Sequence, residues 1–578
     1  MAPTDQLQEV KIMLHGTAAS EGIGIGKVML IEEHSLEYTP RTVTDTEAES
    51  QRFKAAVDAF CYNTEKQAEN LRSSAGEKEA EILAGHIQII KDPYLSGEIE
   101  KLIADGQCAE SALEHMCDMF IAMFSAADDE LTKQRAADVR DIKSGVLGIL
   151  LGVNEIKVSD APKGTVLVAR ELTPSVTAGI VKENIAGIIT ETGGTTSHSA
   201  ILARALEIPA VLSVEGVASS LKNGDTVVVD GSEGDVIVNP DDNTVAEYSK
   251  KRDAFLAERK ELENYRGRET KSASGEAYEL FCNIGKPEDA VKAVDADGEG
   301  VGLFRTEFLF MDRTSIPTED EQFEAYKKAA LILKGKSLII RTLDIGGDKD
   351  IPYLGLEKEE NPFMGFRAIR YCLKNRELFK SQIKAILRAS AFGDIKIMFP
   401  LITTMDELRE GKKLVAECKA DLRNMGINFN ENIQVGVMVE TASAAVIADM
   451  LAKEADFFSI GTNDLTGYTM ACDRGNNDVS YLYSPLQPSV LRMIKRTIEC
   501  GVQNGISVGM CGEAAANKLM IPLLISFGLT EFSVSAPSVL NVRKIISTWT
   551  KEEADKVTAK VLEMSTQQEI VEYLKSVV

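Results

Sequence analysis

A turn rich in glycine and hydroxyl side chains, with a histidine at its end, is the part of this sequence best suited to group transfer. The turn spans residues 193–197, Gly-Gly-Thr-Thr-Ser, and His198 follows it directly. The apolar run 186–190 predicts a buried strand before the turn, and the apolar spacing in 201–206 predicts a helix after it. Backbone N–H groups in the first turn of a helix lack intrahelical partners, and the helix dipole favours negative charge there. His198 is therefore a candidate acceptor of a phosphoryl group, with a purely structural role as the alternative.

The C-terminal half shows a regular alternation of apolar runs and helical patterns. Eight runs predict strands, at residues 280–284, 301–304, 338–341, 395–400, 435–439, 457–460, 507–510 and 531–534. Their number and their span of about 300 residues match a (β/α)8 TIM barrel. A doubly wound sheet is the alternative, because periodicity does not reveal whether a sheet closes on itself.

Polar side chains with chemical potential lie at or near the ends of these strands, where barrel enzymes keep their sites. They are Arg305, Arg341, Glu440, Asn463, Asp464, Arg474 and Cys511. Arginine matches phosphate and carboxylate oxygens in a bidentate fashion, and two carboxylates are a usual way to hold Mg²⁺ over a phosphate. The strand ends therefore predict a pocket for a small phosphorylated acid. Cys511 is either a small buried apolar residue or a positioned proton donor.

Composition excludes several classes of protein. The 578 residues are 44% hydrophobic and 26% charged, and no apolar stretch approaches the ~20 residues that span a bilayer. The first residues lack the features of a secretory signal, and the nine cysteines show no CxxC spacing. We therefore expect a reducing, cytoplasmic location without disulfides or a zinc site. A net charge of −25 argues against nucleic-acid and membrane partners and suits a neutral or basic protein partner.

The texture of the sequence predicts an α/β protein with four parts. An α/β domain comprises residues 10–41 and 153–240, and an all-helical insertion, 42–152, interrupts it. A charged stretch without Gly or Pro at 245–265 predicts a solvated linker helix within 241–270. The barrel occupies 271–578.

Six motifs stand in order along the sequence: Gly193–His198, Arg305–Arg313, Asp344–Lys349, Asn361–Arg370, Gly461–Thr466 and Gly509–Glu513. With them the chain resembles Enzyme I of the bacterial sugar phosphotransferase system, within the phosphoenolpyruvate-utilising enzymes. The likeness covers residues 15–575. It implies a phosphohistidine domain, a helical insertion that docks the carrier protein HPr, and a barrel that binds phosphoenolpyruvate and Mg²⁺ and forms a homodimer. The sequence departs from the family pattern at Thr195, where Arg or Lys is usual, and at Gly467, where Gln is common; the first dozen residues look like an extension.

The resemblance also implies a mechanism, in which Mg²⁺ on Glu440 and Asp464 bridges phosphate and carboxylate oxygens of phosphoenolpyruvate. His198 attacks in line, and Cys511 protonates the departing enolate at carbon to give pyruvate. The side chains that hold the anion are Arg305, Arg341, Asn463 and Arg474, with Lys349 and Arg367 as second contributors. The phosphoryl group then passes to a histidine of HPr, as the first step of sugar uptake, which requires the His198 domain to swing on the linker.

Three alternatives account for less of the sequence. An ATP-dependent phosphoenolpyruvate synthase or pyruvate phosphate dikinase needs a nucleotide-binding domain, and only about 190 residues precede His198. A metal-dependent lyase or aldolase on the barrel leaves His198 unexplained. A non-enzymatic paralogue is expected to have lost site residues that are present here.

Overall fold

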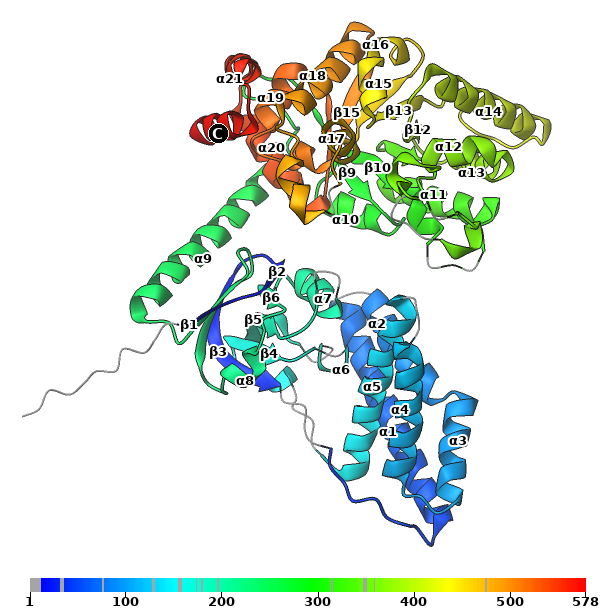
Figure 1. Cartoon of the computed structure of the whole chain (residues 1–578), viewed down its shortest axis with the longest axis vertical. Coiled ribbons are helices and arrows are strands. Elements are labelled where there is room, and N and C mark those ends of the chain that lie inside the picture. Colours follow the sequence, from blue (N-terminus) through cyan, green and yellow to red (C-terminus); the bar gives the residue numbers. More distant parts are fainter. Residues whose placement is uncertain are drawn as a thin grey trace, which may run out of the picture. The chain divides into compact units, whose positions relative to one another are not determined.

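The chain, seen in a computed structural model, forms two compact units, Met1–Arg259 and Lys260–Val578 (Figure 1). The structure describes residues 12–31, 36–74, 77–126, 130–153, 158–172, 174–177, 180–194, 197–311, 313, 315–346, 351–357, 359–473 and 476–578. The first unit holds an open sheet and a group of long helices, and the second holds a closed barrel. The predicted α/β fold class is thereby confirmed.

An eight-stranded mixed sheet forms the base of the first unit, in the order β1-β8-β7-β3-β4-β5-β6-β2. The strands are β1 (Ile12–His15), β2 (Thr17–Ser20), β3 (Ile23–Ile31), β4 (Thr165–Ala169), β5 (Ile185–Thr190), β6 (Ala210–Leu212), β7 (Thr226–Asp230) and β8 (Asp235–Val238). β3, β4, β5 and β6 are parallel, and the remaining neighbours are antiparallel. The central parallel strands are buried on both faces, which explains their nearly continuous apolar sequences.

Five helices lie between β3 and β4 in the sequence and pack around a core of their own. They are α1 (Thr46–Ser74), α2 (Glu77–Ile90), α3 (Pro93–Ala104), α4 (Ala109–Ser125) and α5 (Glu130–Leu151). Figure 1 shows them as a bundle beside the sheet of the same unit. One polar network is enclosed among them, because Arg52 Nη2 lies 2.7 Å from both Glu49 Oε1 and Glu110 Oε2. The predicted helical segment is therefore a separate layer with its own apolar interior.

Shorter helices and one long helix complete the first unit. They are α6 (Pro174–Thr177), α7 (His198–Leu206), α8 (Val217–Ser220) and α9 (Asp242–Leu262), with 3-10 turns at Val158–Asp160 and Lys182–Asn184. α9 is the charged helix that the sequence predicts, and Tyr248 packs it onto Val228 and Ile237 of the sheet. At its other end Arg259 Nη2 donates to Glu207 Oε1 over 2.7 Å.

The second unit is a closed barrel of eight parallel strands. The strands are β9 (Glu279–Ile284), β10 (Gly300–Arg305), β11 (Leu338–Arg341), β12 (Ile395–Phe399), β13 (Val435–Val439), β14 (Phe457–Ile460), β15 (Ser507–Met510) and β16 (Glu531–Val534). β16 pairs with β9 to close the ring. The doubly wound alternative is therefore wrong.

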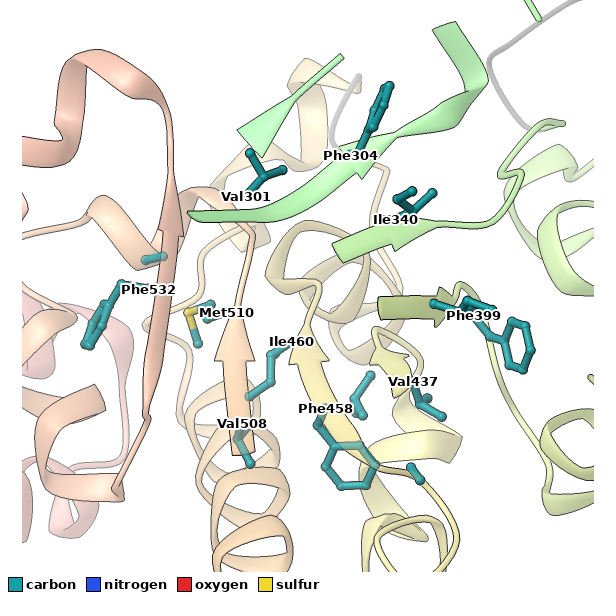
Figure 2. Packing of buried hydrophobic residues seen from close by; sticks show 14 of the residues in the cluster. Val301, Phe304, Ile340, Phe399, Val437, Phe458, Ile460, Val508, Met510 and Phe532 are labelled. Carbon is teal, nitrogen blue, oxygen red and sulfur yellow. The ribbon is translucent and has the colours of Figure 1, made fainter. Parts of the chain in front are cut away.

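Apolar side chains on the outer face of the barrel pack against the surrounding helices (Figure 2). Phe304 meets Tyr326 edge to face with ring centres 5.8 Å apart, and Phe399 meets Phe379 at 5.9 Å. A smaller cluster that includes Leu303, Met438 and Cys511 fills the interior. The strands are thus buried on both sides, which is typical of parallel sheets.

Helices surround the barrel, and several begin with the same local signal. They are α10 (Asp289–Asp295), α11 (Glu319–Leu333), α12 (Ala368–Lys374), α13 (Arg376–Ala389), α14 (Met405–Asn424), α15 (Ala442–Val446), α16 (Ala448–Leu451), α17 (Thr462–Met470), α18 (Pro488–Gln503), α19 (Ile521–Phe527), α20 (Val539–Thr548), α21 (Lys551–Glu563) and α22 (Gln567–Val577). A threonine followed three residues later by glutamate caps α11, α14, α21 and α22 in a reciprocal capping box. Within the described residues, no helix has the length and apolar character to cross a membrane.

Candidate active site

The turn that precedes His198 leads from the buried strand β5 into α7. Gly193 has a φ of +108°, which favours glycine, and its carbonyl accepts a hydrogen bond from Ser213 Oγ at 2.6 Å. Ser197 is the N-cap of α7, and its Oγ accepts from the backbone N–H of Ala200 at 3.3 Å. His198 is the first helical residue. Thr195, Thr196 and the side chain of His198 lie outside the described part of the structure.

Two buried arginines meet one carboxylate at the C-terminal end of the barrel. Arg341, the last residue of β11, places Nη2 2.7 Å from Glu307 Oε1 and Nη1 2.9 Å from Asp344 Oδ2. Arg367 Nη2 lies 2.9 Å from Asp344 Oδ1 and 3.3 Å from Asp464 Oδ2. Asp344 therefore bridges both guanidinium groups. Such pairing orients arginines that are desolvated and ready to receive an anion.

Glu440 is a buried carboxyl group near the other acidic side chains at this end of the barrel. Glu440 follows β13, is 2% exposed, and accepts a hydrogen bond from the backbone N–H of Leu401 at 2.6 Å. Its burial and the nearby charges of Asp464 and Asp344 raise the pKa of the Glu440 carboxyl to about 8. A β-carbon at Gly461 would come within 2.8 Å of Glu440 Oε2, so the glycine leaves room for this carboxylate.

Arg305 and Asn463 lie at the same end of the barrel. Arg305 is the last residue of β10 and is exposed. Asn463 is the second residue of α17, its Nδ2 lies 3.5 Å from Glu513 Oε1, and its carbonyl accepts from Tyr483 Oη at 3.0 Å. Both side chains are accessible to a ligand from solution.

Cys511 directly follows β15 and is buried in the barrel interior. Burial raises the pKa of its thiol to about 11, so the sulfur carries its proton at neutral pH. The charges of Glu440, Arg341 and Arg305 act on this thiol as well. Asn283 Nδ2 donates to the backbone carbonyl of Cys511 at 3.0 Å and so holds the strand end in place. The thiol is thus a protonated group next to the arginine and carboxylate cluster.

Three family descriptions match the sequence. "PEP-utilising enzyme, PEP-binding domain" covers residues 259–550, "PEP-utilising enzyme, N-terminal" covers 15–135, and "PEP-utilising enzyme, mobile domain" covers 161–234. The phosphoenolpyruvate-protein phosphotransferase of Bacillus subtilis (strain 168) is 47% identical over 98% of this chain and 99% of that protein. The phosphotransferase of the same name from Listeria innocua is 45% identical over 97% of this chain and 98% of its own length. The NMR solution structure of Enzyme I (nEIt) is 37% identical, covers 42% of this chain and 99% of its own, and has a TM-score of 0.38.

The chain belongs to the phosphoenolpyruvate-protein phosphotransferases.

Two carboxylates of this phosphotransferase take part in the arginine cluster although the sequence pattern did not single them out as site residues. Glu307 and Asp344 are each about 2% exposed and pair with Arg341. The available signal was their place in the motifs, two residues after Arg305 and three after Arg341. An acidic side chain two or three residues from an arginine can equally be the partner in an exposed ion pair. Spacing alone therefore does not mark Glu307 and Asp344 as site residues.

The structure describes most of the predicted site residues of this phosphotransferase but not all of them. Arg341, Arg367, Glu440, Asp464 and Cys511 come together at one end of the barrel. Lys349 and Arg474, which were expected to contact the anion, lie outside the described residues.

The donor set at Glu440 and Asp464 suits a hard divalent cation. Among the described residues no group of three or more His, Cys, Asp or Glu side chains is arranged to hold a metal. Two carboxylates nonetheless fit Mg²⁺, because this ion keeps several waters and takes its remaining oxygens from a substrate phosphate. Burial first, and then the charges of Asp464 and Asp344, raise the pKa of Glu440, and a bound divalent cation would favour its ionised form.

Proposed function

We propose that this phosphotransferase moves the phosphoryl group of phosphoenolpyruvate to His198 and then to a histidine of HPr, with release of pyruvate. This is the first step of sugar uptake by the phosphotransferase system. The observation that carries the proposal is the cluster of Arg341, Arg367, Glu440 and Asp464 beside a protonated thiol at one end of the barrel. Phosphoryl transfer depends on positioning and electrostatic stabilisation, and this cluster supplies both.

Each part of the cluster has a task in this reaction. Arg305, Arg341, Arg367 and Asn463, with Lys349 and Arg474, bind the carboxylate and phosphate of phosphoenolpyruvate and stabilise the charge that develops as the P–O bond lengthens. Glu440 and Asp464 hold Mg²⁺, which when bound neutralises charge on the phosphate. Asp344 keeps Arg341 and Arg367 oriented while the anion is absent.

Cys511 acts as the general acid for the enolate. Its thiol holds a proton at neutral pH and lies in the barrel interior, away from bulk water. Transfer of that proton to the methylene carbon of enolpyruvate forms the C–H bond of pyruvate and leaves a thiolate on Cys511.

The division of labour among the parts follows the predicted boundaries. Residues 10–41 and 153–240 form the phosphohistidine domain, 42–152 the HPr-docking domain, 241–270 the linker, and 271–578 the phosphoenolpyruvate-binding and dimerisation domain. His198 serves two partners, so its domain swings on the linker between them. A cytoplasmic location agrees with nine free thiols.

Exposed apolar side chains support both protein contacts in this proposal. Met119 and Met123 lie one turn apart on α4, 45% and 55% exposed, and offer HPr an apolar surface. Val446 and Met450, on α15 and α16 of the barrel, are 51% and 52% exposed and suit the homodimer contact. We expect Met123→Glu to weaken phosphoryl transfer to HPr while leaving phosphorylation of the protein itself intact.

The deciding experiment incubates the purified protein with phosphoenolpyruvate, Mg²⁺ and HPr. We expect one acid-labile phosphate per chain without HPr, and continuous pyruvate release with it. His198→Ala should abolish the labelling, and His15→Ala, a histidine 72% exposed on β1, is the matched control that should retain it. If His198→Ala carried as much acid-labile phosphate as the wild type, His198 would not be the acceptor.

A further inference from the structure

Glu531 is a buried acid in the barrel interior that the reaction as described above does not use. It is the first residue of β16 and is 4% exposed. Its Oε1 lies over two glycines, since a β-carbon at Gly509 would come within 2.8 Å of it and one at Gly302 within 2.5 Å. Among the described residues this oxygen has no hydrogen-bond partner. A buried carboxyl with one unsatisfied oxygen costs stability and therefore calls for an explanation.

The strand register shows what Glu531 faces. Ser459 on β14, Gly509 on β15 and Glu531 on β16 are direct neighbours across the sheet. Their successors in the chain, Ile460, Met510 and Phe532, are the outward-packing side chains labelled in Figure 2. Because side chains alternate along a strand, these three preceding residues share the inner face.

The hydroxyl of Ser459 and the carboxyl of Glu531 therefore face each other across a strand that has no side chain between them. Because Glu531 Oε1 lies over Gly509, the gap from it to Ser459 is about one strand spacing, roughly 5 Å, which one water molecule bridges. Neither Ser459 Oγ nor Glu531 Oε1 has a hydrogen-bond partner among the described residues, so both oxygens are free to bind such a water. Ser459 lies close enough to the Cys511 thiol to lower its pKa, and the thiol itself donates to the backbone carbonyl of Ile460 over 3.8 Å. Carboxyl, hydroxyl and thiol thus lie in sequence along the inner face, beside the apolar cluster that includes Leu303 and Met438.

Glu531, the first residue of β16, lies at the N-terminal end of the barrel strands. Glu279, the exposed first residue of β9, is the register neighbour of Glu531 on its other side. The charged groups that face Glu531 are Glu279 from β9 and Lys396 from β12, while β10 and β15 present glycine there. Burial, with the charge of Glu279, raises the pKa of the Glu531 carboxyl to about 8. Glu531 is therefore mostly protonated at neutral pH, and transfer of its proton to a Cys511 thiolate, whose pKa is about 11, is downhill.

We propose that Glu531 returns a proton to Cys511 through Ser459 after each turnover, and that this route draws protons from the opening of the barrel beside Glu279. It rests on the proposed role of Cys511 in protonating the enolate. The S–H bond of Cys511 breaks as the C–H bond of pyruvate forms. The thiolate then takes the hydroxyl proton of Ser459, Ser459 takes a proton from the bridging water, and that water takes the carboxyl proton of Glu531. Water at the opening reprotonates Glu531, so each pyruvate consumes one proton from solvent.

A route of this kind solves a physical difficulty. Cys511 is 4% exposed. Bound pyruvate would cover the side of the thiolate that faces the substrate, so bulk water would reach the sulfur poorly. Neither Glu531 nor Ser459 touches the substrate; they act through Cys511. Their loss should therefore leave the first protonation intact and slow the later ones.

The test is a rapid-mixing measurement of pyruvate release with excess phosphoenolpyruvate, Mg²⁺ and HPr. For Glu531→Gln we expect a burst of one pyruvate per chain at the wild-type rate, followed by turnover at least tenfold slower. Ser459→Ala should give the same burst, and Glu531→Asp, which keeps the carboxyl, should restore part of the later rate. Glu299→Gln makes the same change at the same end of the barrel but outside its interior, where Glu299 accepts from the Leu280 backbone, and should show no burst.

Each outcome decides the proposal. Glu531→Gln with steady turnover at the wild-type rate overturns it, and so does a variant whose first turnover or phosphoenolpyruvate binding is lost, because Glu531 would then be structural. If Glu531→Gln does not fold, Ser459→Ala is judged by the same result, an intact first turnover followed by slower steady turnover. A wild-type protein that releases no pyruvate would instead refute the proposed function, and Cys511→Ser with unchanged turnover would refute the proton donor on which this route depends.

Discussion

At the scale of single residues, the environment of each group matters more than its type. Cys511 and Glu440 are both buried, and burial raises the pKa of each. In the proposed reaction the thiol thereby keeps the proton that it donates, whereas the carboxyl group would be stabilised in its ionised form by a bound cation. Arg341 and Arg367 are buried too, yet they retain their charge because Asp344 pairs with both. Burial at the strand ends thus affects the thiol, the carboxyl group and the arginines in three different ways.

Cys511→Ser tests the proton donor against a mere packing role. Serine has nearly the size of cysteine but a far higher pKa, so it is a poor acid. We expect pyruvate formation to fall by ~10²–10⁴-fold, the usual contribution of general acid catalysis. Binding of phosphoenolpyruvate with Mg²⁺, followed by titration, should stay close to wild type. Near-normal turnover would leave Cys511 as packing only.

Replacement of Glu440 or Asp464 by Ala tests the metal ligands. We expect the Mg²⁺ concentration for half-maximal activity to rise by more than the ~10–100-fold typical of losing an outer-sphere partner. Glu454→Gln, at an exposed ion pair with Arg409, serves as the control. An unchanged Mg²⁺ dependence with high activity would contradict the assignment.

Asp344→Ala removes the partner that two buried arginines share. Loss of one member of a buried ion pair costs about 3–5 kcal/mol in the free energy of unfolding when the remaining charge is left uncompensated. We expect the lower end of this range, because Arg341 keeps Glu307 and Arg367 keeps Asp464 as partners. Urea unfolding followed by circular dichroism measures this cost. We also expect phosphoenolpyruvate to stabilise the variant more than it stabilises the wild type, since the substrate supplies the missing anion. Equal stabilisation would argue that Asp344 does not orient these arginines.

At the scale of elements, short local signals start the helices that position the site. α7 begins at His198 because Ser197 caps it, and the preceding glycines allow the reversal from β5. β5 is almost entirely buried, whereas residues 191–194, which lead from it towards α7, are partly or fully exposed. The proposed acceptor, His198, is thus the first residue of a helix that begins at a single capping side chain.

Ser197→Ala should destabilise the start of α7. Removal of an N-cap side chain costs ~0.5–2 kcal/mol. We expect faster hydrogen exchange at the Ala200 amide and slower phosphorylation of His198, with binding of phosphoenolpyruvate to the barrel unaffected. Ser197→Asp, which preserves a cap, should recover the exchange protection. Slow exchange in the alanine variant would show that Ser197 is not needed for the helix start.

At the scale of the whole molecule, each compact unit carries its own core, and the barrel begins before its first strand. Arg543 of α20 is 2% exposed and donates to the carbonyl of Tyr265 at 3.1 Å and to Thr270 Oγ1 at 3.0 Å. Its Nη2 also donates to the carbonyl of Asp297 at 2.8 Å. The segment between the linker helix and β9 is therefore part of the barrel unit in structural terms.

Two fragments test this boundary. Residues 271–578 should fold, form a dimer and bind phosphoenolpyruvate with Mg²⁺, because all eight strands and their core are included. Residues 260–578 should have a higher melting temperature, since the shorter fragment leaves Arg543 without two of its acceptors. Calorimetry measures the melting temperatures, and analytical sedimentation measures dimer formation. Equal melting temperatures would show that Arg543 contributes nothing through these contacts.

The sequence by itself determined the local elements and the chemical types at their ends. Period-two and continuous apolar runs placed the eight strands of the barrel, since burial on each side of a strand is written in adjacent residues. Glycines and a hydroxyl placed the start of α7, because caps and turns depend on a few neighbouring side chains. The types of Arg341, Glu440 and Cys511 at strand ends indicated the class of substrate.

Only the tertiary structure decided which of these elements and side chains meet. Closure of the sheet requires β16 to pair with β9, a contact between residues some 250 positions apart that periodicity does not encode. The sharing of Asp344 by Arg341 and Arg367, and the facing of Ser459 and Glu531 across Gly509, likewise depend on register between strands. Such pairings arise from packing of the whole barrel, because each is selected by free energy summed over distant parts of the chain rather than by its own neighbours in sequence.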